Sequence, residues 1–312
     1  MKILLTGIAG FVGRHLALSL RDLGHEVCGT DLPGQIPVPG FEVKELDLSR
    51  EDPSPMLREI RPDAVVHLAA QSSPARSLKD PRATFESNVT GTHRLLEAMR
   101  ESCPDTRLLF VGSADVYGSS DSAHSEDDPL EPGNPYGASK AAGEMLVLQY
   151  ARTWSLPWFA TRSFPHSGPG QSTDFVLPAF AKQIAEAEAG LREPRILVGN
   201  LQARRDWLDL RDVLCAYELL LEKGQPGEVY NVCSGQAHSV REALDYFVSR
   251  SKLPLEIVED PSRLRPVDLP LLLGDYSRLQ EATGWTPQFS FSEMLERVLS
   301  YWKEHAVKEK TK

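Results

Sequence analysis

Residues 2–13 read KILLTGIAGFVG and join a short apolar run to glycines at G-x-x-G-x-x-G spacing. The run Ile3–Leu5 predicts a strand, and apolar residues at helical spacing between Arg14 and Leu23 predict a helix directly after the glycines. In such a unit the glycines let the backbone approach a pyrophosphate, which the N–H groups at the start of the helix can bind. The expected cofactor contacts are Gly7, Gly10, Phe11, Val12 and Gly13.

A second expected strand, Glu26–Thr30, is followed at once by Asp31. A carboxylate at this position can accept hydrogen bonds from both hydroxyls of an adenosine ribose, and its charge repels a 2′-phosphate. We therefore expect Asp31 to bind the cofactor and to favour NAD(H), with NADP(H) as the alternative. An aspartate at a strand end is also a common turn residue, and that interpretation stays open.

The alternation of strand and helix continues through the first half of the chain. Further strands are expected at Ala64–Ala70, Arg107–Gly112 and Trp158–Arg162, and helices at Asn88–Glu101 and Tyr136–Tyr150. Continuous apolar strands between amphipathic helices are typical of a parallel sheet with helices on both faces. The sequence thus predicts an α/β fold of the Rossmann type, a doubly wound parallel sheet.

After about Pro165 the alternation becomes less regular. Helices are expected at Phe180–Gly190, Ser239–Arg250 and Phe291–Glu304, the last with Ser290 and Glu293 spaced as a capping box, and strands at Arg195–Val198 and Glu228–Cys233. This pattern predicts a dinucleotide-binding domain at residues 1–165, to which residues 202–236 return. Residues 166–201 and 237–312 would form a smaller α/β lobe that binds the substrate.

Composition excludes several other classes of protein. The chain has 312 residues with Lys and Arg 34 against Asp and Glu 44, a net charge of −10, and no basic run that would favour nucleic acid or an anionic membrane. No stretch reaches the roughly 20 apolar residues of a membrane-spanning helix. The four cysteines lack metal-ligand spacing, so we expect reduced thiols, no metal and a cytoplasmic location.

Tyr136 and Lys140 lie four residues apart in an expected helix and therefore share a face. The lysine charge can lower the pKa of the phenol and the ammonium can hold a cofactor ribose, although this spacing is also common on solvated helices. Ser113 favours the catalytic interpretation because it follows the carboxyl end of a strand, where ligand sites of open α/β sheets lie. The three residues are a candidate proton-donating set beside a nicotinamide.

These motifs together resemble the extended short-chain dehydrogenase/reductase superfamily. Supporting matches are Asp47-Leu48, His67-Leu68-Ala69-Ala70, Asn88 and the segment Arg205–Asp209. The second half is similar to the group of GDP-mannose 4,6-dehydratases and GDP-4-keto-6-deoxy-mannose reductases, through Gly168–Gln171, Phe180–Ile184, Val198–Leu201, Asn231–Gly235 and Arg263–Pro266. The resemblance implies cofactor contacts from Asp47, Leu48, Leu68, Ala69, Ala70, Asn88, Tyr136 and Lys140.

The resemblance also implies the reaction. Dehydratases of this group use Thr-x-Glu to remove the C5 proton, whereas this chain has Ser113-Ala114-Asp115. The missing Glu favours a reductase that converts a GDP-4-keto-6-deoxy-mannose to GDP-D-rhamnose. Asp115 is either a catalytic carboxylate or a turn residue. A 4,6-dehydratase or 4-epimerase with recycled NAD(P) is the nearest alternative, and a cofactor sensor without turnover is a more remote one.

A GDP-linked substrate needs cations for its diphosphate, and arginine suits bidentate phosphate contacts. The resemblance implies substrate contacts from Gln71, His166, Lys182, Asn200, Arg205 and Arg265. One departure from the superfamily is Pro165, which stands where an Asn commonly binds the sugar nucleotide; His166 is expected to compensate.

The resemblance further implies a homodimer in which the helices Asn88–Glu101 and Tyr136–Tyr150 pack against their copies as a four-helix interface. The small residues Ala138, Ala141, Ala142 and Gly143 permit a close helix approach. The same residues could instead pack on the protein's own sheet.

Overall fold

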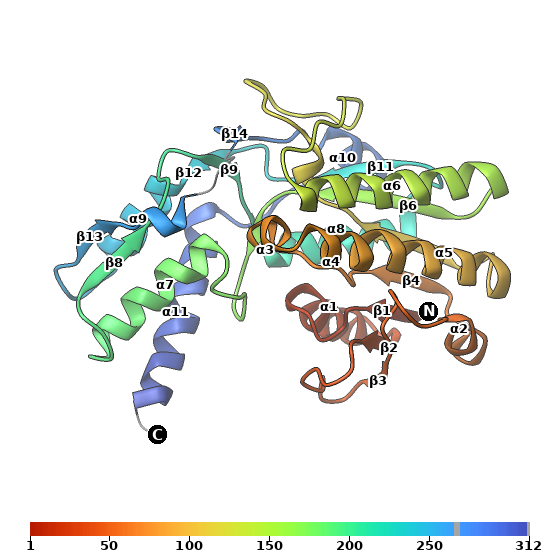
Figure 1. Ribbon diagram of the computed structural model, residues 1–312, viewed down its shortest axis with the longest axis horizontal. Coiled ribbons are helices and arrows are strands. Elements are labelled where there is room, and N and C mark those ends of the chain that lie inside the picture. The colour runs from red at the N-terminus through yellow and green to blue at the C-terminus, as the bar shows by residue number, and fades with distance from the viewer. Residues whose placement is uncertain (265–268, 311–312) are drawn as a thin grey trace.

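A parallel sheet of seven strands forms the centre of the larger part of the molecule (Figure 1). The computed structural model describes residues 1–264 and 269–310. The strand order is β11-β6-β5-β4-β1-β2-β3, and every pairing in it is parallel. The strands are β1 (Lys2–Thr6), β2 (Glu26–Asp31), β3 (Glu42–Glu45), β4 (Ala64–His67), β5 (Arg107–Val111), β6 (Trp158–Ser163) and β11 (Val229–Val232).

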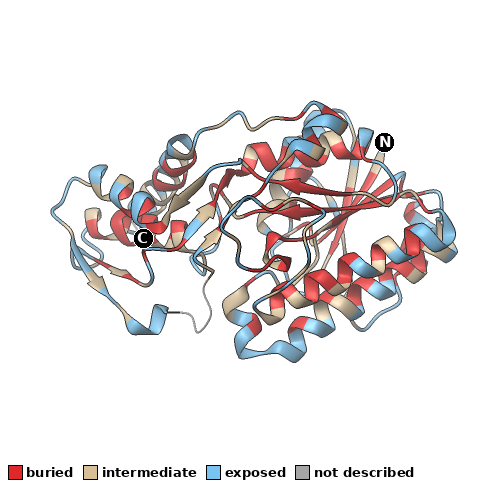
Figure 2. Cartoon of the chain, turned by 90° about the horizontal axis from the view of Figure 1, so that it is seen from above, coloured by how far each residue is buried: buried red, intermediate tan, exposed pale blue. Residues whose placement is uncertain are grey.

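Helices cover both faces of this sheet, because successive strand residues point to opposite sides. Ile3 and Leu5 pack into a first core with α1 (Phe11–Asp22), α8 (Leu210–Lys223) and α10 (Ser277–Thr283). Leu4 packs into a second core with α2 (Ser54–Ile60), α5 (Gly91–Ser102) and α6 (Pro135–Trp154). Apart from the edge strand β3, whose residues are exposed or half-buried, the strands are mostly buried (Figure 2). The predicted doubly wound α/β fold is confirmed.

Short helical segments lead into α5. They are α3 (Pro74–Lys79), α4 (Pro81–Phe85) and a π-helical turn at Glu86–Thr90. A 3₁₀ turn, Ala114–Val116, follows β5 and comes before α6. These segments shape the carboxyl edge of the sheet, where the predicted site residues lie.

The smaller lobe lies at one end of the sheet and has its own apolar core (Figure 1). Its helices are α7 (Val176–Glu188), α9 (Val240–Ser249) and α11 (Phe291–Lys310), and a 3₁₀ turn spans Pro261–Arg263. Its strands are β8 (Arg195–Val198) paired with β13 (Glu256–Glu259), and β9 (Arg204–Asp206) between β12 (Ala237–Ser239) and β14 (Leu271–Leu272). Strands β7 (His166–Ser167) and β10 (Leu208–Asp209) pair where the chain passes between the two parts.

The expected capping box before α11 is confirmed. The Ser290 N–H donates to the Glu293 carboxylate at 2.8 Å, and the Glu293 N–H donates to Ser290 Oγ at 3.3 Å. These bonds satisfy two N–H groups that an α-helix leaves without an internal partner.

Several elements differ from the expected ones. No expected element covers β3, α2 or α8, and the helix expected from Asn88 begins inside the π-helical turn. The strand expected at Ala64–Ala70 ends at His67, because the residues after it turn over the edge of the sheet. Helix α7 starts at Val176, before the expected Phe180, and α11 continues to Lys310.

The chain also returns to the large sheet a second time. Leu279 of α10 and Trp285 after it belong to the first core, although both fall inside residues 237–312, which the sequence assigns to the lobe. Within residues 1–264 and 269–310, no helix is long and apolar enough to cross a membrane.

Candidate active site

The glycine turn between β1 and α1 fits a dinucleotide. Gly7 has a φ of +75°, and a Cβ there would lie 2.9 Å from the Ala69 nitrogen, so both conformation and space require glycine. A Cβ on Gly13 would overlap the Gly7 carbonyl oxygen. Gly10 is the N-cap of α1 and supplies no side-chain cap. The first N–H groups of α1, including those of Phe11 and Val12, are thus left for an anion such as a pyrophosphate.

Asp31 ends β2 directly beside this turn. One carboxylate oxygen accepts a hydrogen bond from the Ala9 N–H at 2.7 Å, and the other accepts from the Leu32 N–H at 2.8 Å. Each carboxylate oxygen can accept more than one hydrogen bond, so the group can hold the turn and still bind hydroxyls. Asp31 therefore acts as a turn residue and also carries negative charge to the expected ribose position.

The segment after β3 reaches the same region. The Leu46 N–H donates to the Asp31 carbonyl at 2.8 Å, which places Asp47 and Leu48 just beyond the end of β2. Asp47 accepts bonds from the Ser49 N–H at 2.9 Å and the Ser49 hydroxyl at 2.7 Å. Leu48 is buried. Both residues lie where an adenine would follow the ribose, and their contact with it stays a prediction.

His67, at the end of β4, holds the loop that contains Leu68, Ala69 and Ala70. The Thr92 hydroxyl donates to the Asn88 carbonyl at 2.7 Å, so it accepts from His67 Nε2–H at 2.9 Å. His67 Nδ1 then accepts from the Thr6 hydroxyl at 2.7 Å. Burial and, next, the Lys140 charge lower the pKa of His67 to about 3, which keeps the ring neutral.

The hydrogen bonds that start at His67 continue through Thr6 to the loop after β4. The Ala69 N–H donates to Thr6 Oγ1 at 3.2 Å, and the Leu68 N–H donates to the Thr6 carbonyl at 3.1 Å. His67 and Thr6 thereby fix the loop beside the glycine turn. Sequence patterns gave neither residue a role, because the two side chains meet only when β1 and β4 pair.

Asn88 and Gln71 fix the far end of that loop. Asn88 Oδ1 accepts from the Gln71 N–H at 2.7 Å, and its amide donates to the Gln71 carbonyl at 3.0 Å and to Ser139 Oγ at 2.9 Å. The Gln71 amide in turn donates to the Ser73 carbonyl at 3.0 Å and Thr84 Oγ1 at 3.1 Å, while its oxygen accepts from the Ser73 N–H at 2.5 Å. Both amides thus shape the loop and join it to α6.

Ser113 and Tyr136 meet at the carboxyl edge of the sheet. Burial and, next, the Asp115 charge raise the pKa of the Tyr136 phenol, while a hydrogen bond with Ser113 opposes this rise. A Cβ on Gly137 would overlap the Asp115 carbonyl oxygen, so α6 approaches the segment after β5 closely at this point. The buried phenol is therefore held in its protonated form beside the Ser113 hydroxyl.

Lys140 lies one helical turn further along α6. Its ammonium donates to the Val111 carbonyl at 2.9 Å and lies 5.2 Å from the centre of the Phe110 ring. Burial lowers the pKa of Lys140 to about 8. The predicted set of Ser113, Tyr136 and Lys140 is gathered at the carboxyl end of β5 and the start of α6. The expected lowering of the Tyr136 pKa by Lys140 is wrong, because burial and the Asp115 charge raise that pKa and Lys140 is not among its causes.

Asp115 belongs to the same cluster through its charge on Tyr136. Its N–H donates to Ser113 Oγ at 3.2 Å, and Ser113 is the N-cap of the 3₁₀ turn Ala114–Val116. The backbone of Asp115 therefore has a structural role, while the charge of its carboxylate raises the pKa of Tyr136. The two interpretations of Asp115 are compatible.

A buried ion pair joins strand β6 to helix α6. Arg162 of β6 contacts both carboxylate oxygens of Glu144, with Nη2 at 2.7 Å and Nε at 3.0 Å, and both side chains are almost fully buried. Arg162 Nη1 donates to Tyr117 Oη at 2.8 Å and to the Glu126 carbonyl at 2.9 Å. The Tyr117 hydroxyl donates to Asn231 Oδ1 at 2.8 Å. The network joins β6, β11, α6 and the segment after β5.

His166 lies against the glycine turn. Its Nδ1–H donates to the Phe164 carbonyl at 2.9 Å, and its ring stacks on Phe11 with 6.3 Å between centroids. His15 Nε2 pairs with the Pro169 carbonyl at 3.0 Å. Burial lowers the pKa of His166. The loop 166–171 therefore packs against the start of α1 and brings the lobe to the cofactor side.

Two of the predicted substrate cations, Lys182 and Arg205, lie in the lobe. Lys182 pairs with Glu186 at 3.5 Å and lies 5.4 Å from the Trp302 ring centre. Arg205 Nη1 donates to the Leu269 carbonyl at 2.7 Å. Asn200 Oδ1 accepts from the Gln202 N–H at 2.9 Å. Arg265 lies outside the described residues.

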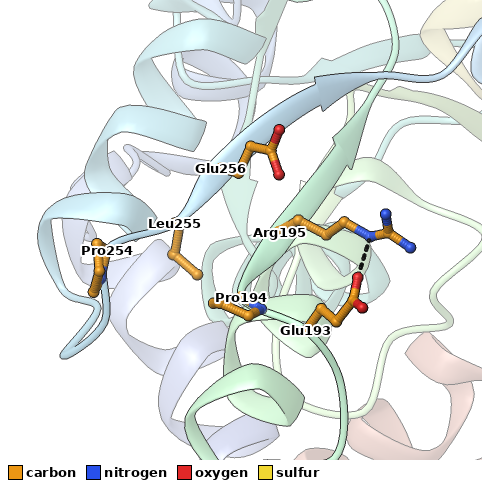
Figure 3. A pocket seen from close by; sticks show the side chains of 6 residues that line it. All are labelled: Glu193, Pro194, Arg195, Pro254, Leu255 and Glu256. Atoms are coloured by element: carbon orange, nitrogen blue, oxygen red, sulfur yellow. Dashed lines mark ion pairs between the residues drawn. The ribbon is translucent and has the colours of Figure 1, made fainter.

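A separate pocket lies between β8 and β13, at the outer side of the lobe (Figure 3). It is lined by Glu193, Pro194, Arg195, Pro254, Leu255 and Glu256. Arg195 Nε pairs with the Glu193 carboxylate at 3.3 Å, so the cation in this pocket is already balanced. None of the predicted site residues lines it.

Comparison with known proteins assigns the chain to a family. The profile of the family described as GDP-mannose 4,6 dehydratase matches residues 4–298. The chain belongs to this family. GDP-6-deoxy-D-mannose reductase of Pseudomonas aeruginosa is 38% identical over 99% of this chain and 99% of that protein. GDP-mannose 4,6 dehydratase 2 of Arabidopsis thaliana is 33% identical over 98% of this chain and 88% of that protein.

Solved structures of similar proteins superpose on almost the whole chain. The structure of RMD from Pseudomonas aeruginosa complexed with NADPH has a TM-score of 0.85 and 36% identity, covering 97% of this chain and 99% of that one. UDP-glucose 4-epimerase of Thermus thermophilus in complex with NAD has a TM-score of 0.87 and 29% identity, covering 97% and 99%. The chain is an extended short-chain dehydrogenase/reductase of the nucleotide-sugar oxidoreductase type.

Proposed function

We propose that this enzyme reduces the C4 ketone of GDP-4-keto-6-deoxy-mannose with NAD(P)H and forms GDP-D-rhamnose. The full-length similarity to a GDP-6-deoxy-D-mannose reductase carries this proposal. The cluster of Ser113, Tyr136 and Lys140 provides the groups that such a reduction requires.

Each side chain of the site has its own role in the proposed reduction. A nicotinamide dinucleotide at the glycine turn supplies the hydride. Tyr136, whose buried phenol stays protonated, gives its proton to the C4 oxygen as that oxygen becomes negative. Ser113 donates a hydrogen bond to the same oxygen and stabilises its growing charge. The Lys140 ammonium stabilises the tyrosinate left behind and binds the cofactor ribose.

A 4,6-dehydratase is the second candidate, and Asp115 is the observation in its favour. Its charge acts directly on Tyr136, so a carboxylate lies near the place where a sugar C5 proton would be removed. A 4-epimerase would use the same core set without that carboxylate. A cofactor sensor without turnover is a third candidate, and the assembled Tyr136, Lys140 and Ser113 argue against it.

The deciding experiment follows NAD(P)H absorbance with GDP-4-keto-6-deoxy-mannose, beside a parallel reaction with GDP-mannose alone, with products identified by mass. Stoichiometric loss of reduced cofactor and a product heavier by two hydrogens are expected. Loss of water from GDP-mannose without net cofactor consumption would identify a dehydratase and make Asp115 the next residue to replace. Binding without any turnover would identify the sensor.

Substrate contacts within this proposal come from both parts of the molecule. We assign the diphosphate to Lys182, Arg205 and Arg265. The sugar end is assigned to Gln71, His166 and Asn200. Pro165 supplies no side-chain donor, and its carbonyl accepts from the Leu208 N–H at 2.9 Å. We therefore assign the role of the usual Asn to the next residue, His166.

Asp31 is proposed to favour NADH over NADPH. Replacing Asp31 with Ser removes a charge beside the ribose, so the ratio of the NADPH Kd to the NADH Kd should fall by about tenfold, a difference of about 1.4 kcal/mol. Fluorescence titration of the reduced cofactors measures both constants. Replacing Asp22, an exposed aspartate of α1, is the control and should leave the ratio unchanged. Tighter NADPH binding by the unaltered enzyme would contradict the proposal.

We also propose a homodimer in which the helices predicted at Asn88–Glu101 and Tyr136–Tyr150 pack against their copies; α4 lies beside them. Phe85 is 40% exposed and Met145 is 65% exposed on neighbouring helices, as an apolar contact surface requires. Replacing both with Glu should convert a dimer to a monomer at micromolar concentration, measured by sedimentation velocity. Replacing Leu23, which is 59% exposed on α1, is the control. A monomeric unaltered enzyme would contradict the proposal.

The cytoplasm is the proposed location of the enzyme. All four cysteines are free thiols, which is the state that a reducing compartment maintains.

A further inference from the structure

Three hydroxyl groups are buried together at the end of β6. Ser163 Oγ lies 2.6 Å from the Tyr217 hydroxyl and 3.3 Å from Thr161 Oγ1. Thr161 and Tyr217 are completely buried, and Ser163 is 7% exposed. Burial raises the pKa of Tyr217 to about 12, although hydrogen bonds with Ser163 and Thr161 oppose the rise. The three hydroxyls are therefore neutral and can satisfy one another.

The position of this cluster follows from strand register. Val111 of β5 lies opposite Thr161 of β6, and the two chains stay close beyond that pair because the Gly112 N–H donates to the Thr161 carbonyl at 2.9 Å. Two residues further on, Ser163 and Ser113 therefore both lie at the carboxyl edge of the sheet, just past the Val111–Thr161 pair. Ser163 is the member of the cluster nearest to the open edge.

The cluster also reaches the proton-donating tyrosine. Tyr217 is close enough to Tyr136 to raise the pKa of the Tyr136 phenol, after burial and the Asp115 charge have done so. Two pairs of hydroxyls, Ser113 with Tyr136 and Ser163 with Tyr217, thus lie side by side at the ends of β5 and β6. The proposed reaction uses the first pair and leaves the second without a role.

Core packing alone does not require the second pair. Tyr217 lies in the first apolar core, where Phe, Ala and Val would fill the three positions with nearly the same shape. Replacing hydrogen-bonded partners together by apolar groups of equal shape is often close to neutral for stability. A buried cluster of hydroxyl groups at the edge of the sheet is explained when one of the hydroxyls binds a polar group of a ligand.

We propose that Ser163 binds the carboxamide of the nicotinamide ring, and that Tyr217 and Thr161 are positioning residues that orient the Ser163 hydroxyl. A hydroxyl can donate to the carboxamide oxygen or accept from its amide, and the two hydroxyls behind Ser163 adjust to either arrangement. The contact fixes the nicotinamide end of the cofactor beside Tyr136. It rests on nicotinamide binding alone and holds for any sugar substrate.

The test compares two ligands with the same adenosine half. NADH carries the nicotinamide, and ADP-ribose lacks it; the 2′-phosphorylated pair serves if NADPH binds more tightly. Ser163→Ala should raise the NADH Kd by about fivefold, the range of one lost neutral hydrogen bond, and leave the ADP-ribose Kd unchanged. Tyr217→Phe should act in the same direction with a smaller change. Calorimetric titration of the whole enzyme measures both ligands without turnover.

The ratio of the two dissociation constants separates this contact from a structural role. Tyr230→Phe is the matched control. Tyr230 is buried in the same core, and its hydroxyl accepts a hydrogen bond from the backbone N–H of Gln225 at 3.1 Å. Equal weakening of NADH and ADP-ribose in Ser163→Ala would overturn the proposal, and so would no change in either. If Tyr217→Phe does not fold, Ser163→Ala and Thr161→Val still test the proposal, because each should weaken NADH binding and leave ADP-ribose binding unchanged. None of these results depends on which sugar is reduced.

Discussion

Replacing Tyr136 with Phe should lower kcat by about 100-fold or more, the contribution expected of a positioned proton donor. The phenol is buried beside Ser113, and its raised pKa keeps the proton in place until the C4 oxygen requires it. Phenylalanine fills nearly the same space and lacks only the hydroxyl group that carries this proton and bonds with Ser113. Steady-state reduction of the keto sugar, followed by cofactor absorbance, measures the loss.

Binding measurements separate chemistry from folding in this variant. The cofactor Kd should rise by no more than about fivefold, the loss of one hydrogen bond, because Tyr136 is one of several expected cofactor contacts and Lys140 and the glycine turn are retained. Tyr230→Phe again provides a buried tyrosine without a role at the site and should retain full kcat. A Tyr136→Phe enzyme with more than a tenth of the normal kcat would show that another group donates the proton.

Replacing Arg162 with Leu should lower the free energy of unfolding by about 3–5 kcal/mol, because Glu144 is then left buried without its counter-charge. Tyr117 Oη and the Glu126 carbonyl lose a donor in the same change. Urea unfolding followed by circular dichroism measures the difference. The catalytic helix α6 carries Glu144, so kcat should fall as well.

A double variant tests the physical reason for that loss. Replacing Arg162 and Glu144 together by Leu removes both charges, and a buried ion pair can often be exchanged for apolar side chains at little cost. The double variant should therefore be more stable than Arg162→Leu alone. If the two were equally unstable, the loss would come from the Tyr117 and Glu126 contacts instead.

Local patterns were enough to predict the architecture of the larger part. The strand–turn–helix unit at the start depends on neighbours in sequence, and apolar strands of a parallel sheet are continuous and easily seen. Helix α8 shows the limit: Val213, Tyr217 and Leu220 repeat at helical spacing, yet no expected element covers them. Strand β3 alternates only weakly between exposed and half-buried residues and has little apolar signal.

Only part of the candidate site could be predicted from the sequence. Ser113, Tyr136 and Lys140 could be predicted because one motif spacing and one sheet edge bring them together. The links from His67 to Thr6 and from Arg162 to Glu144 join residues of different strands and helices. Such pairs depend on tertiary packing, which spacing along the chain does not encode. The hydroxyl cluster of Ser163 and Tyr217 is hidden from the sequence for the same reason.

The repeated passage of the chain between the sheet and the lobe has a practical consequence. A fragment of residues 1–165 would keep the glycine turn and Tyr136 but would lack α8, α10 and β11, which cover one face and complete one edge of the sheet. That face would be apolar and open to water, so the cofactor half cannot be excised as a soluble unit. Engineering of this enzyme must therefore exchange loops rather than whole modules.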